Sequence, residues 1–496
     1  MSLSYDALRA NVDPTDDSGL SRVEVNQRAL IDKILARYAS ANAVYRELLQ
    51  NSNDATADTA EIEFTTKKRS DGTDTGIVEQ VVYRNNGIPF RNEDWKRLQK
   101  IAEGNPDVSK VGAFGVGAYT MFSICEEPII TSGDQVLAFV WRGDALYTKT
   151  VKAQGDRSAE DKKWTSFVLP SRDPYPLPHM VEFGEFLCAS LTFTQCLKYI
   201  RVSVNGKERM SILKTAVQEP RPVQTPESAS SSQSPLQRLW NATTGSNDGV
   251  VTATPNGTFY LQNSKNSSCI RESVSRITVT LDDDLATLDA RYVSAVAKTK
   301  IPSDMARRME RVTKKQPPKQ VNIQIFLNAQ SAKGGSVGHK YKNNKAELIT
   351  QSFSPRAGAG RIFIGFRTSQ TTGLAAHLAA PFVPTVEREA MDLQDPTLRL
   401  FNKELLEMSG ILMRLALEDT MYSVIDVAYK SKAAEREKLE KELQEQARMK
   451  KKAKEQEVAK ASEEASEETT KEQEEEETSS SRFMGFARFM AKYVLM

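Results

Sequence analysis

The sequence has few of the residues that build disulfide frameworks and metal centres. Its 496 residues include four cysteines, with no Cys-x-x-Cys spacing among them, and three histidines. These low numbers of cysteines and histidines argue against a disulfide scaffold and against a His-rich metal site. We expect reduced, mostly buried thiols in an intracellular protein, either cytoplasmic or nuclear.

Long apolar runs are also missing. No stretch of about 18 apolar residues occurs, so we expect no membrane span. The N-terminus has no apolar core of the signal-peptide type. The 67 Lys and Arg residues nearly balance the 65 Asp and Glu residues, giving a net charge of +2. This balance gives no strong nucleic-acid signal and argues against a mainly electrostatic nucleic-acid binder.

The apolar residues that are present suffice for more than one folded region. After a flexible leader at residues 1–20, strand and helix patterns over residues 21–215 predict an α/β sandwich with helices on one face of a sheet. Residues 216–250 are rich in Pro and Ser, which is typical of a linker. Strand-like segments between residues 251 and 396 predict a second α/β domain.

The C-terminal part has a helical pattern. Residues 397–445 predict one long helix with the 3,4 repeat of a coiled-coil seam, formed by Leu398, Phe401, Leu405, Met408, Leu412 and Leu415. Residues 446–481 form a charged low-complexity segment, which we interpret as a solvated helix that frays into disorder. Residues 482–496 form an amphipathic tail, either a surface for a membrane or partner helix or part of a core helix.

Three short segments carry the candidate chemistry. The first lies in a predicted helix, the second follows a predicted strand, and the third is a Gly-rich loop: "ELLQNSNDA" at 47–55, "NNGIPF" at 85–90 and "GAFGVGAYT" at 112–120. In the first segment, Glu47, Asn51 and Asp54 are spaced i, i+4 and i+7, which places them on one face of a helix. Taken alone, that face could be merely solvated.

Each segment supplies a part that a magnesium triphosphate site needs. Magnesium prefers oxygen ligands and keeps several waters, so one amide such as Asn51 plus phosphate oxygens suffices. A carboxylate one helical turn away, Glu47, can orient or deprotonate an attacking water. Glycines at 112, 115 and 117 let the backbone approach phosphates and offer N–H donors to them. A lone Gly-rich loop is more often a tight turn, so the prediction depends on all three segments together.

Together these segments resemble the nucleotide site of the GHKL ATPases, the superfamily of gyrase, the ninety-kilodalton heat-shock chaperones, histidine kinases and mismatch-repair ATPases. The resemblance covers about residues 20–170, and the heat-shock branch is closest. It implies a Bergerat-type two-layer α/β sandwich that binds ATP and Mg²⁺. It also implies that Glu47 is the general base, that Asn51 is the magnesium ligand, and that Asp54 supports the nucleotide from the same helix.

The same resemblance implies roles for the loop and for a later strand. The phosphates would be wrapped by Gly112, Phe114, Gly115, Val116 and Gly117. Thr165, in "WTSFVLP", stands where the family keeps a Thr that helps to hold the adenine-binding carboxylate and its water.

One position departs from the family pattern. The family begins its D-x-G-x-G segment with an Asp whose carboxylate accepts a hydrogen bond from the adenine amino group. This chain has Asn85 there, followed by Asn86 and Gly87, and Pro89 replaces the last glycine. An Asn oxygen still accepts that bond, but the amide is neutral and can flip. The lost charge would weaken adenine binding by about 1–2 kcal/mol.

A second resemblance lies at residues 360–389, "GRIFIGFRTSQTTGLAAHLAAPFVPTVERE". This segment resembles the one that follows the ATPase module in the Sacsin/No-Vein class, and the whole arrangement is closest to large fungal proteins of that class. Those chains are longer, so we expect a short or truncated member. His377 has two interpretations, a nucleotide contact or a structural turn residue. Arg361 and Arg367 could reach a γ-phosphate or lie at the surface.

The sequence therefore predicts an ATP-binding, chaperone-like protein that hydrolyses ATP slowly. A lid around residues 100–117 would close over Mg-ATP and drive conformational change, on behalf of a protein client or co-chaperone that the sequence does not identify. The alternative is a non-hydrolysing nucleotide sensor or scaffold that acts through protein–protein interaction. A nuclear, DNA-associated member of the superfamily is a third possibility, which the near-neutral charge disfavours.

Overall fold

A long mixed β-sheet runs through most of the folded chain. The computed structural model describes residues 25–36, 42–101, 117–153, 158–223, 250–263, 268–328, 344–385 and 389–493. The chain divides into two units, Met1–Ala416 and Leu417–Met496, and the sheet lies in the first. Its strands have the order β15-β14-β16-β13-β12-β11-β8-β7-β1-β2-β6-β3-β4-β5, with β10 pairing with β12 and β9.

The N-terminal part of the sheet follows the strand patterns of the sequence. Its strands are β1 (Thr59–Lys68), β2 (Asp74–Asn85), β3 (Ile129–Ser132), β4 (Gln135–Arg142), β5 (Ala145–Lys152), β6 (Thr165–Pro176), β7 (Tyr199–Val204) and β8 (Lys207–Pro222). Its helices are α2 (Gln27–Leu35), α3 (Ala43–Asp54), α4 (Asn92–Leu98), α5 (Ala159–Lys162), α6 (Met180–Thr192) and the 3₁₀ helix η1 (Gly117–Ser123).

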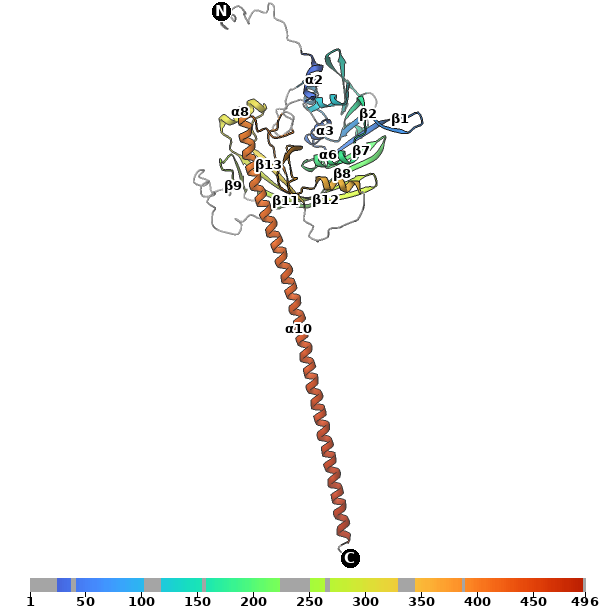
Figure 1. Ribbon diagram of the computed structural model, residues 1–496, viewed down its shortest axis with the longest axis vertical. Helices are drawn as coiled ribbons and strands as arrows, with labels where there is room; N and C mark the ends of the chain where they lie inside the picture. The colour runs from blue at the N-terminus through green and yellow to red at the C-terminus, as the bar shows by residue number, and fades with distance from the viewer. Residues whose placement is uncertain are drawn as a thin grey trace, which may run out of the picture. The chain divides into compact units, whose positions relative to one another are not determined.

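The remaining elements complete the sheet and cover it (Figure 1). The strands are β9 (Val250–Ala253), β10 (Phe259–Gln262), β11 (Ile270–Leu281), β12 (Asp284–Thr299), β13 (Gln320–Asn328), β14 (Arg361–Phe363), β15 (Arg367–Thr371) and β16 (His377–Ala379). The helices are α8 (Ser303–Thr313), α9 (Lys345–Phe353) and α10 (Pro396–Tyr493). Among the described residues, no helix has both the length and the apolar content that crossing a membrane requires.

The predicted α/β sandwich is confirmed, and β1 shows how the sequence builds it. Burial alternates along β1, because successive side chains of a strand point to opposite faces of the sheet. The fully buried Phe64 packs against Tyr45 of α3, with ring centroids 6.1 Å apart, and against Phe183 of α6, at 5.8 Å. The two helices therefore cover the same face of the sheet.

The two predicted α/β regions share one sheet, because β8 pairs with β11 along its length. β8 ends at Pro222, so it extends into the segment 216–250 that we predicted as linker. The pairing of β8 with β7 ends at Leu213. Beyond that residue β8 is paired with β11 along one edge and no longer with β7 along the other. Such an edge tolerates proline, which has no N–H to donate. Residues 224–249 lie outside the described residues.

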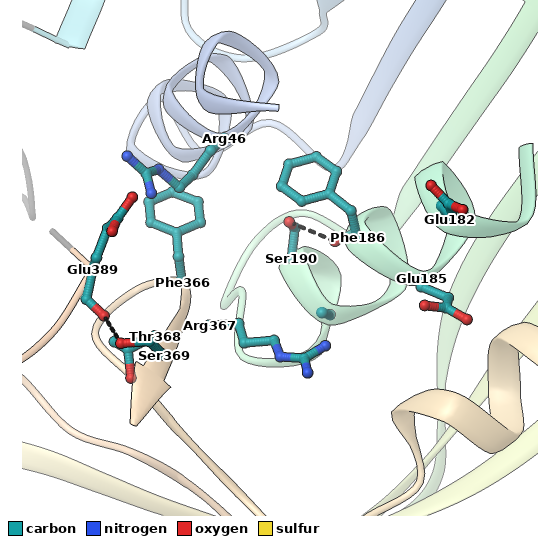
Figure 2. A pocket seen from close by; sticks show the side chains of 11 residues that line it. Arg46, Glu182, Glu185, Phe186, Ser190, Phe366, Arg367, Thr368, Ser369 and Glu389 are labelled. Atoms are coloured by element: carbon teal, nitrogen blue, oxygen red, sulfur yellow. Dashed lines mark hydrogen bonds between the residues drawn. The ribbon is translucent and has the colours of Figure 1, made fainter. Parts of the chain in front are cut away.

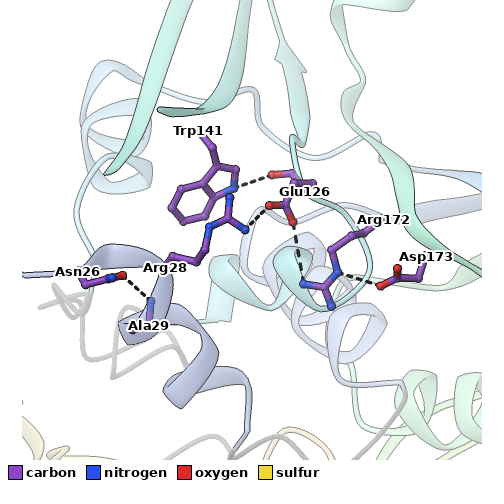
Figure 3. Close-up of polar contacts among 7 residues, drawn as sticks. All are labelled: Asn26, Arg28, Ala29, Glu126, Trp141, Arg172 and Asp173. Carbon is purple, nitrogen blue, oxygen red and sulfur yellow. Dashed lines mark hydrogen bonds and ion pairs between the residues drawn. The ribbon is translucent and has the colours of Figure 1, made fainter. Parts of the chain in front are cut away.

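Helix α2 is held against the β4–β5 hairpin by a stacked and charged contact (Figure 3). The Arg28 guanidinium lies 4.2 Å from the centre of the Trp141 ring and forms an ion pair with Glu126. The Trp141 indole N–H donates to the backbone oxygen of Glu126 at 3.0 Å. Glu126 also faces Arg172 of β6 at 4.0 Å, so this carboxylate links α2 to the sheet.

Lys214 joins the end of α6 to the shared sheet. Its Nζ donates to the backbone oxygens of Thr192 at 3.1 Å and Thr194 at 2.8 Å, and the Tyr292 hydroxyl donates to Thr192 O at 3.1 Å. These bonds satisfy the last carbonyl group of α6, at Thr192, and one in the turn that follows the helix. Burial lowers the pKa of the Lys214 ammonium to about 8, with the nearby Lys198 cation as the smaller cause.

The lowered pKa of Lys214 predicts a pH-dependent stability. Between about pH 8 and pH 10.5 the unfolded chain binds a proton that the folded chain has lost, so the free energy of unfolding should rise with pH. Lys214→Met should remove this contribution, which is at most about 1.4 kcal/mol per pH unit. Urea unfolding across the window measures it, with the exposed Lys300→Met as control. A constant difference between wild type and Lys214→Met would contradict the assignment.

The apolar seam of α10 is covered within the first unit. Its six predicted members are buried, each 5% exposed or less: Leu398, Phe401, Leu405, Met408, Leu412 and Leu415. They belong to a core cluster with the strands of the second region, and Phe401 contacts Phe259 of β10 at 5.3 Å. A 3,4 repeat shows which face of a helix is apolar but not what covers it. Here the cover comes from the protein's own sheet and from Met305 and Met309 of α8.

α10 continues to Tyr493, beyond the end at residue 445 that we predicted, and through the segment 446–481 that we expected to fray. Glu, Lys, Ala and Gln dominate this segment, and all four have high helix propensity. Pairs spaced i, i+4 add small contributions, such as Lys441 with Glu437 at 2.9 Å.

Two adjacent leucines of α10 provide a matched test of this packing. Leu405 is 0% exposed and Leu406 is 39% exposed. Leu405→Ala should lower the free energy of unfolding by about 2–5 kcal/mol, because it leaves a cavity in the core. Leu406→Ala should change it by about 0.5 kcal/mol or less. Chemical denaturation of both variants measures the difference, and equal losses would argue against the observed orientation of α10.

Candidate functional site

The three polar residues of α3 lie at different depths. Glu47 is 2% exposed, whereas Asn51, one turn later, is exposed. Asp54 is half-buried and accepts a hydrogen bond from Gln50 Nε2 at 2.7 Å. The helix therefore presents a buried carboxylate and, one turn away, an amide at the surface.

The backbone at Gly117 lies directly against the Glu47 carboxylate. A Cβ atom at Gly117 would stand 2.2 Å from Glu47 Oε2, so a larger residue there would force the carboxylate to shift. η1 is fixed there because Thr120 Oγ1 donates to Gly117 O at 2.6 Å and the Tyr119 hydroxyl donates to Leu98 O at 2.9 Å. After the Gly-rich loop the chain forms this short 3₁₀ helix. The other predicted loop contacts lie outside the described residues: Gly112, Phe114, Gly115 and Val116.

Asn85 and Thr165 lie opposite each other in the pairing of β2 with β6. Both are buried, at 4% and 2% exposed. Asn85 Oδ1 accepts from the Gly87 N–H at 3.0 Å, and the Thr165 hydroxyl lies 2.7 Å from that of Ser132. The Ser132 hydroxyl also accepts from the Phe90 N–H at 2.9 Å. Sequence reasoning missed Ser132, because nothing in its local pattern distinguishes it from an ordinary strand-end serine.

The turn after β2 packs on the end of α3. The Ile88 N–H donates to Ala55 O at 2.9 Å, and a Cβ atom at Gly87 would stand 2.7 Å from the same oxygen. Asn86 accepts from the backbone N–H groups of Asp58 at 3.1 Å and Thr59 at 3.0 Å, so its role is to close the loop. The turn and the helix, which we predicted as two parts of one site, are thus in direct contact.

On its other side α3 contacts the second region through Arg46. This side chain is 7% exposed, and its Nε lies 3.7 Å from Glu47 Oε1. Its guanidinium lies 5.6 Å from the centre of the Phe366 ring. Figure 2 shows both groups beside a cavity of about 340 Å³. The cavity is lined by Arg46, Glu182, Glu185, Phe186, Ala189, Ser190, Phe366, Arg367, Thr368, Ser369 and Glu389.

His377 is a structural residue in this fold. It is 4% exposed, its Nδ1 accepts from the Arg361 N–H at 2.9 Å, and its Nε2 lies 2.8 Å from Phe353 O. Because a carbonyl oxygen only accepts, Nε2 carries the proton. Burial lowers the pKa of the imidazole to about 4. The Arg361 guanidinium donates to Ser369 O at 3.1 Å, and Arg367 lines the cavity.

The close approach of Gly117 to Glu47 gives a double-mutant test. Gly117→Ala should lower the free energy of unfolding by about 1–3 kcal/mol, because the added methyl group overlaps the carboxylate. In a Glu47→Ala background the overlap partner is gone, so the same change should cost much less. Thermal or urea unfolding of the four proteins completes the cycle. An identical cost in both backgrounds would show that the two groups are not in contact.

Two family models match the chain. One, described as "Protein of unknown function (DUF3684)", matches residues 191–480, which is more than half of the chain. The other, described as "Sacsin domain", matches residues 25–179. Sacsin of Homo sapiens is 35% identical over 112 residues, which cover 21% of this chain and 2% of sacsin. The chain thus spans a small fraction of that relative's length.

Two solved structures are similar at low TM-score. The topoisomerase IV ATP-binding domain of Francisella tularensis, in complex with a small-molecule inhibitor, has 14% identity and a TM-score of 0.26, with 49% of this chain and 62% of that chain covered. The N-terminal domain of a DNA repair protein has 10% identity and a TM-score of 0.30, with coverages of 79% and 99%. The Sacsin-domain match and the human relative confirm the similarity to the Sacsin class predicted from the sequence.

Proposed function

The chain belongs to the family described as "Protein of unknown function (DUF3684)", and we propose that its Sacsin-like N-terminal part binds a magnesium nucleoside triphosphate and hydrolyses it slowly. ATP is the ligand that the family resemblance predicts. The observation that carries the proposal is the contact of α3 with η1. There a buried carboxylate, Glu47, lies against a glycine backbone, and the exposed amide of Asn51 follows one turn later.

The residues present fit a magnesium triphosphate. A Cβ atom at Gly117 would overlap the Glu47 carboxylate, so glycine lets the η1 backbone come close to the proposed general base. Among the described residues, no group of three or more His, Cys, Asp and Glu side chains is placed to hold a metal ion. Magnesium needs no such group, because phosphate oxygens and waters complete its coordination around Asn51. When bound, the ion neutralises charge that develops on the phosphates.

The chain's own groups divide the remaining work. Glu47 orients the attacking water and takes its proton, while the Arg46 guanidinium, 3.7 Å away, offsets the cost of burying the carboxylate. Asp54 supports the nucleotide from the end of α3. Asn85 and Thr165 lie beside the purine ring of the nucleotide. The phosphate contacts of the Gly-rich loop, and closure of the predicted lid around residues 100–117, remain part of the proposal.

Nucleotide binding would reach the second region through two connections. The first is the continuous sheet, in which β8 pairs directly with β11. The second is Arg46, which contacts Glu47 on one side and the Phe366 ring on the other. A ligand that moves α3 therefore acts on both regions, as a chaperone-like conformational cycle would need. Its client or co-chaperone would be a protein.

A second candidate function is a non-hydrolysing nucleotide sensor or scaffold. Asn85 favours it, because a neutral amide stands where the ATP-binding family has a carboxylate. The buried Glu47 opposes it, because a sensor that never hydrolyses has no need of a base kept out of water.

Replacing Glu47 tests the proposed hydrolysis. Glu47→Gln keeps the shape of the side chain but cannot take a proton, so turnover should fall by about a hundredfold or more while nucleotide affinity is kept. Phosphate release and equilibrium binding measure the two effects separately. Glu182→Gln, on the exposed first turn of α6, is the control and should behave as wild type. Undiminished turnover in Glu47→Gln would remove the base from the proposal.

A further inference from the structure

The orientation of the Asn85 amide is set by its neighbour. A carboxamide has one accepting end, Oδ1, and one donating end, Nδ2, which X-ray maps usually cannot distinguish. In this chain the Gly87 N–H donates to the side chain at 3.0 Å. Because a backbone N–H can only donate, the atom facing it must be the oxygen. The nitrogen therefore points the other way, and the ambiguity left by the sequence disappears.

The free end of Asn85 is a hydrogen-bond donor in a mostly buried position. The residue is 4% exposed, and among the described residues the bond from Gly87 is the hydrogen bond that its side chain makes. Next to it on β6, the Thr165 hydroxyl is paired with Ser132. Nδ2 keeps some contact with solvent, so a ligand that presents an acceptor at this point can take the place of water there.

We propose that the site prefers a 6-oxopurine nucleoside triphosphate to ATP. The inference rests on the proposed function, which places the base beside Asn85. Adenine carries an amino group at position 6, and two donors facing each other form no bond. Guanine and hypoxanthine carry a carbonyl oxygen there, which accepts from Nδ2. A donor that loses its acceptor in a buried site typically lowers affinity by about tenfold to a hundredfold.

An aspartate at this position has the opposite preference for the same geometric reason. Either carboxylate oxygen accepts from the Gly87 N–H, and the other oxygen remains free to accept from an amino group. Asn85→Asp therefore exchanges one donor for one acceptor with almost no change of shape. The substitution converts the hydrogen-bonding character of this position while the fold of the turn is kept.

The test compares ITP with ATP on the full chain, in the presence of Mg²⁺. These nucleotides have the same sugar and triphosphate, and their bases differ at the purine N1–C6 edge. By equilibrium titration, the wild type should bind ITP at least about tenfold more tightly than ATP, a difference of about 1.4 kcal/mol. Asn85→Asp should reverse the order. The ratio of the two dissociation constants is the readout, because a general loss of stability lowers both affinities and leaves their ratio unchanged.

Asn53→Asp is a matched control on α3. Asn53 Oδ1 accepts from the backbone N–H groups of Gln195 and Cys196, both at 3.0 Å, and a carboxylate accepts from them equally well. This variant adds the same charge as Asn85→Asp but should leave the ITP to ATP ratio unchanged.

The outcomes separate the two proposals. Tighter binding of ATP by the wild type, or a ratio that Asn85→Asp does not move, would overturn the base preference and leave the nucleotide site in place. Failure of ATP, ITP and GTP alike to bind would overturn both. Reversal in Asn85→Asp alone, with Asn53→Asp behaving as wild type, is the result that the structure predicts.

Discussion

The burial of the Glu47 carboxylate is the constraint on which the site depends. A carboxylate that is 2% exposed is costly unless charged or polar groups accompany it, and Arg46 stands 3.7 Å away. A side chain at Gly117 would force the same carboxylate to move, so glycine suits η1 where it meets α3. Proteins keep such costly arrangements mainly at functional sites, which is why this one carries the proposed function.

One continuous sheet connects this site to the rest of the first unit. Strand β8 belongs to the N-terminal region and pairs with β11 of the second region, so the sheet continues from one into the other. Lys214 and Tyr292 bond to the end of α6 from that shared sheet. On the helical side, Phe366 contacts Arg46. A displacement of α3 would therefore change contacts in both layers of the sandwich.

Local patterns in the sequence predicted much of this, and long-range pairing explains what they missed. The alternation in β1 and the i, i+4 spacing on α3 are local, so both elements were predictable. Ser132 acts through a hydroxyl pair with Thr165 that only strand pairing creates. β8 runs into a Pro-rich segment because β11 pairs with it there. The orientation of Asn85 depends on a bond from Gly87, whereas the sequence shows only that an amide replaces a carboxylate.

The most direct test of the central claim is a calorimetric titration of the full chain with a slowly hydrolysed purine nucleoside triphosphate analogue, with and without Mg²⁺. We expect one saturable site whose affinity falls when Mg²⁺ is removed or when Asn51 is replaced by Ala. The account is contradicted if neither an adenine nor a 6-oxopurine triphosphate binds, or if binding is indifferent both to the metal and to Asn51.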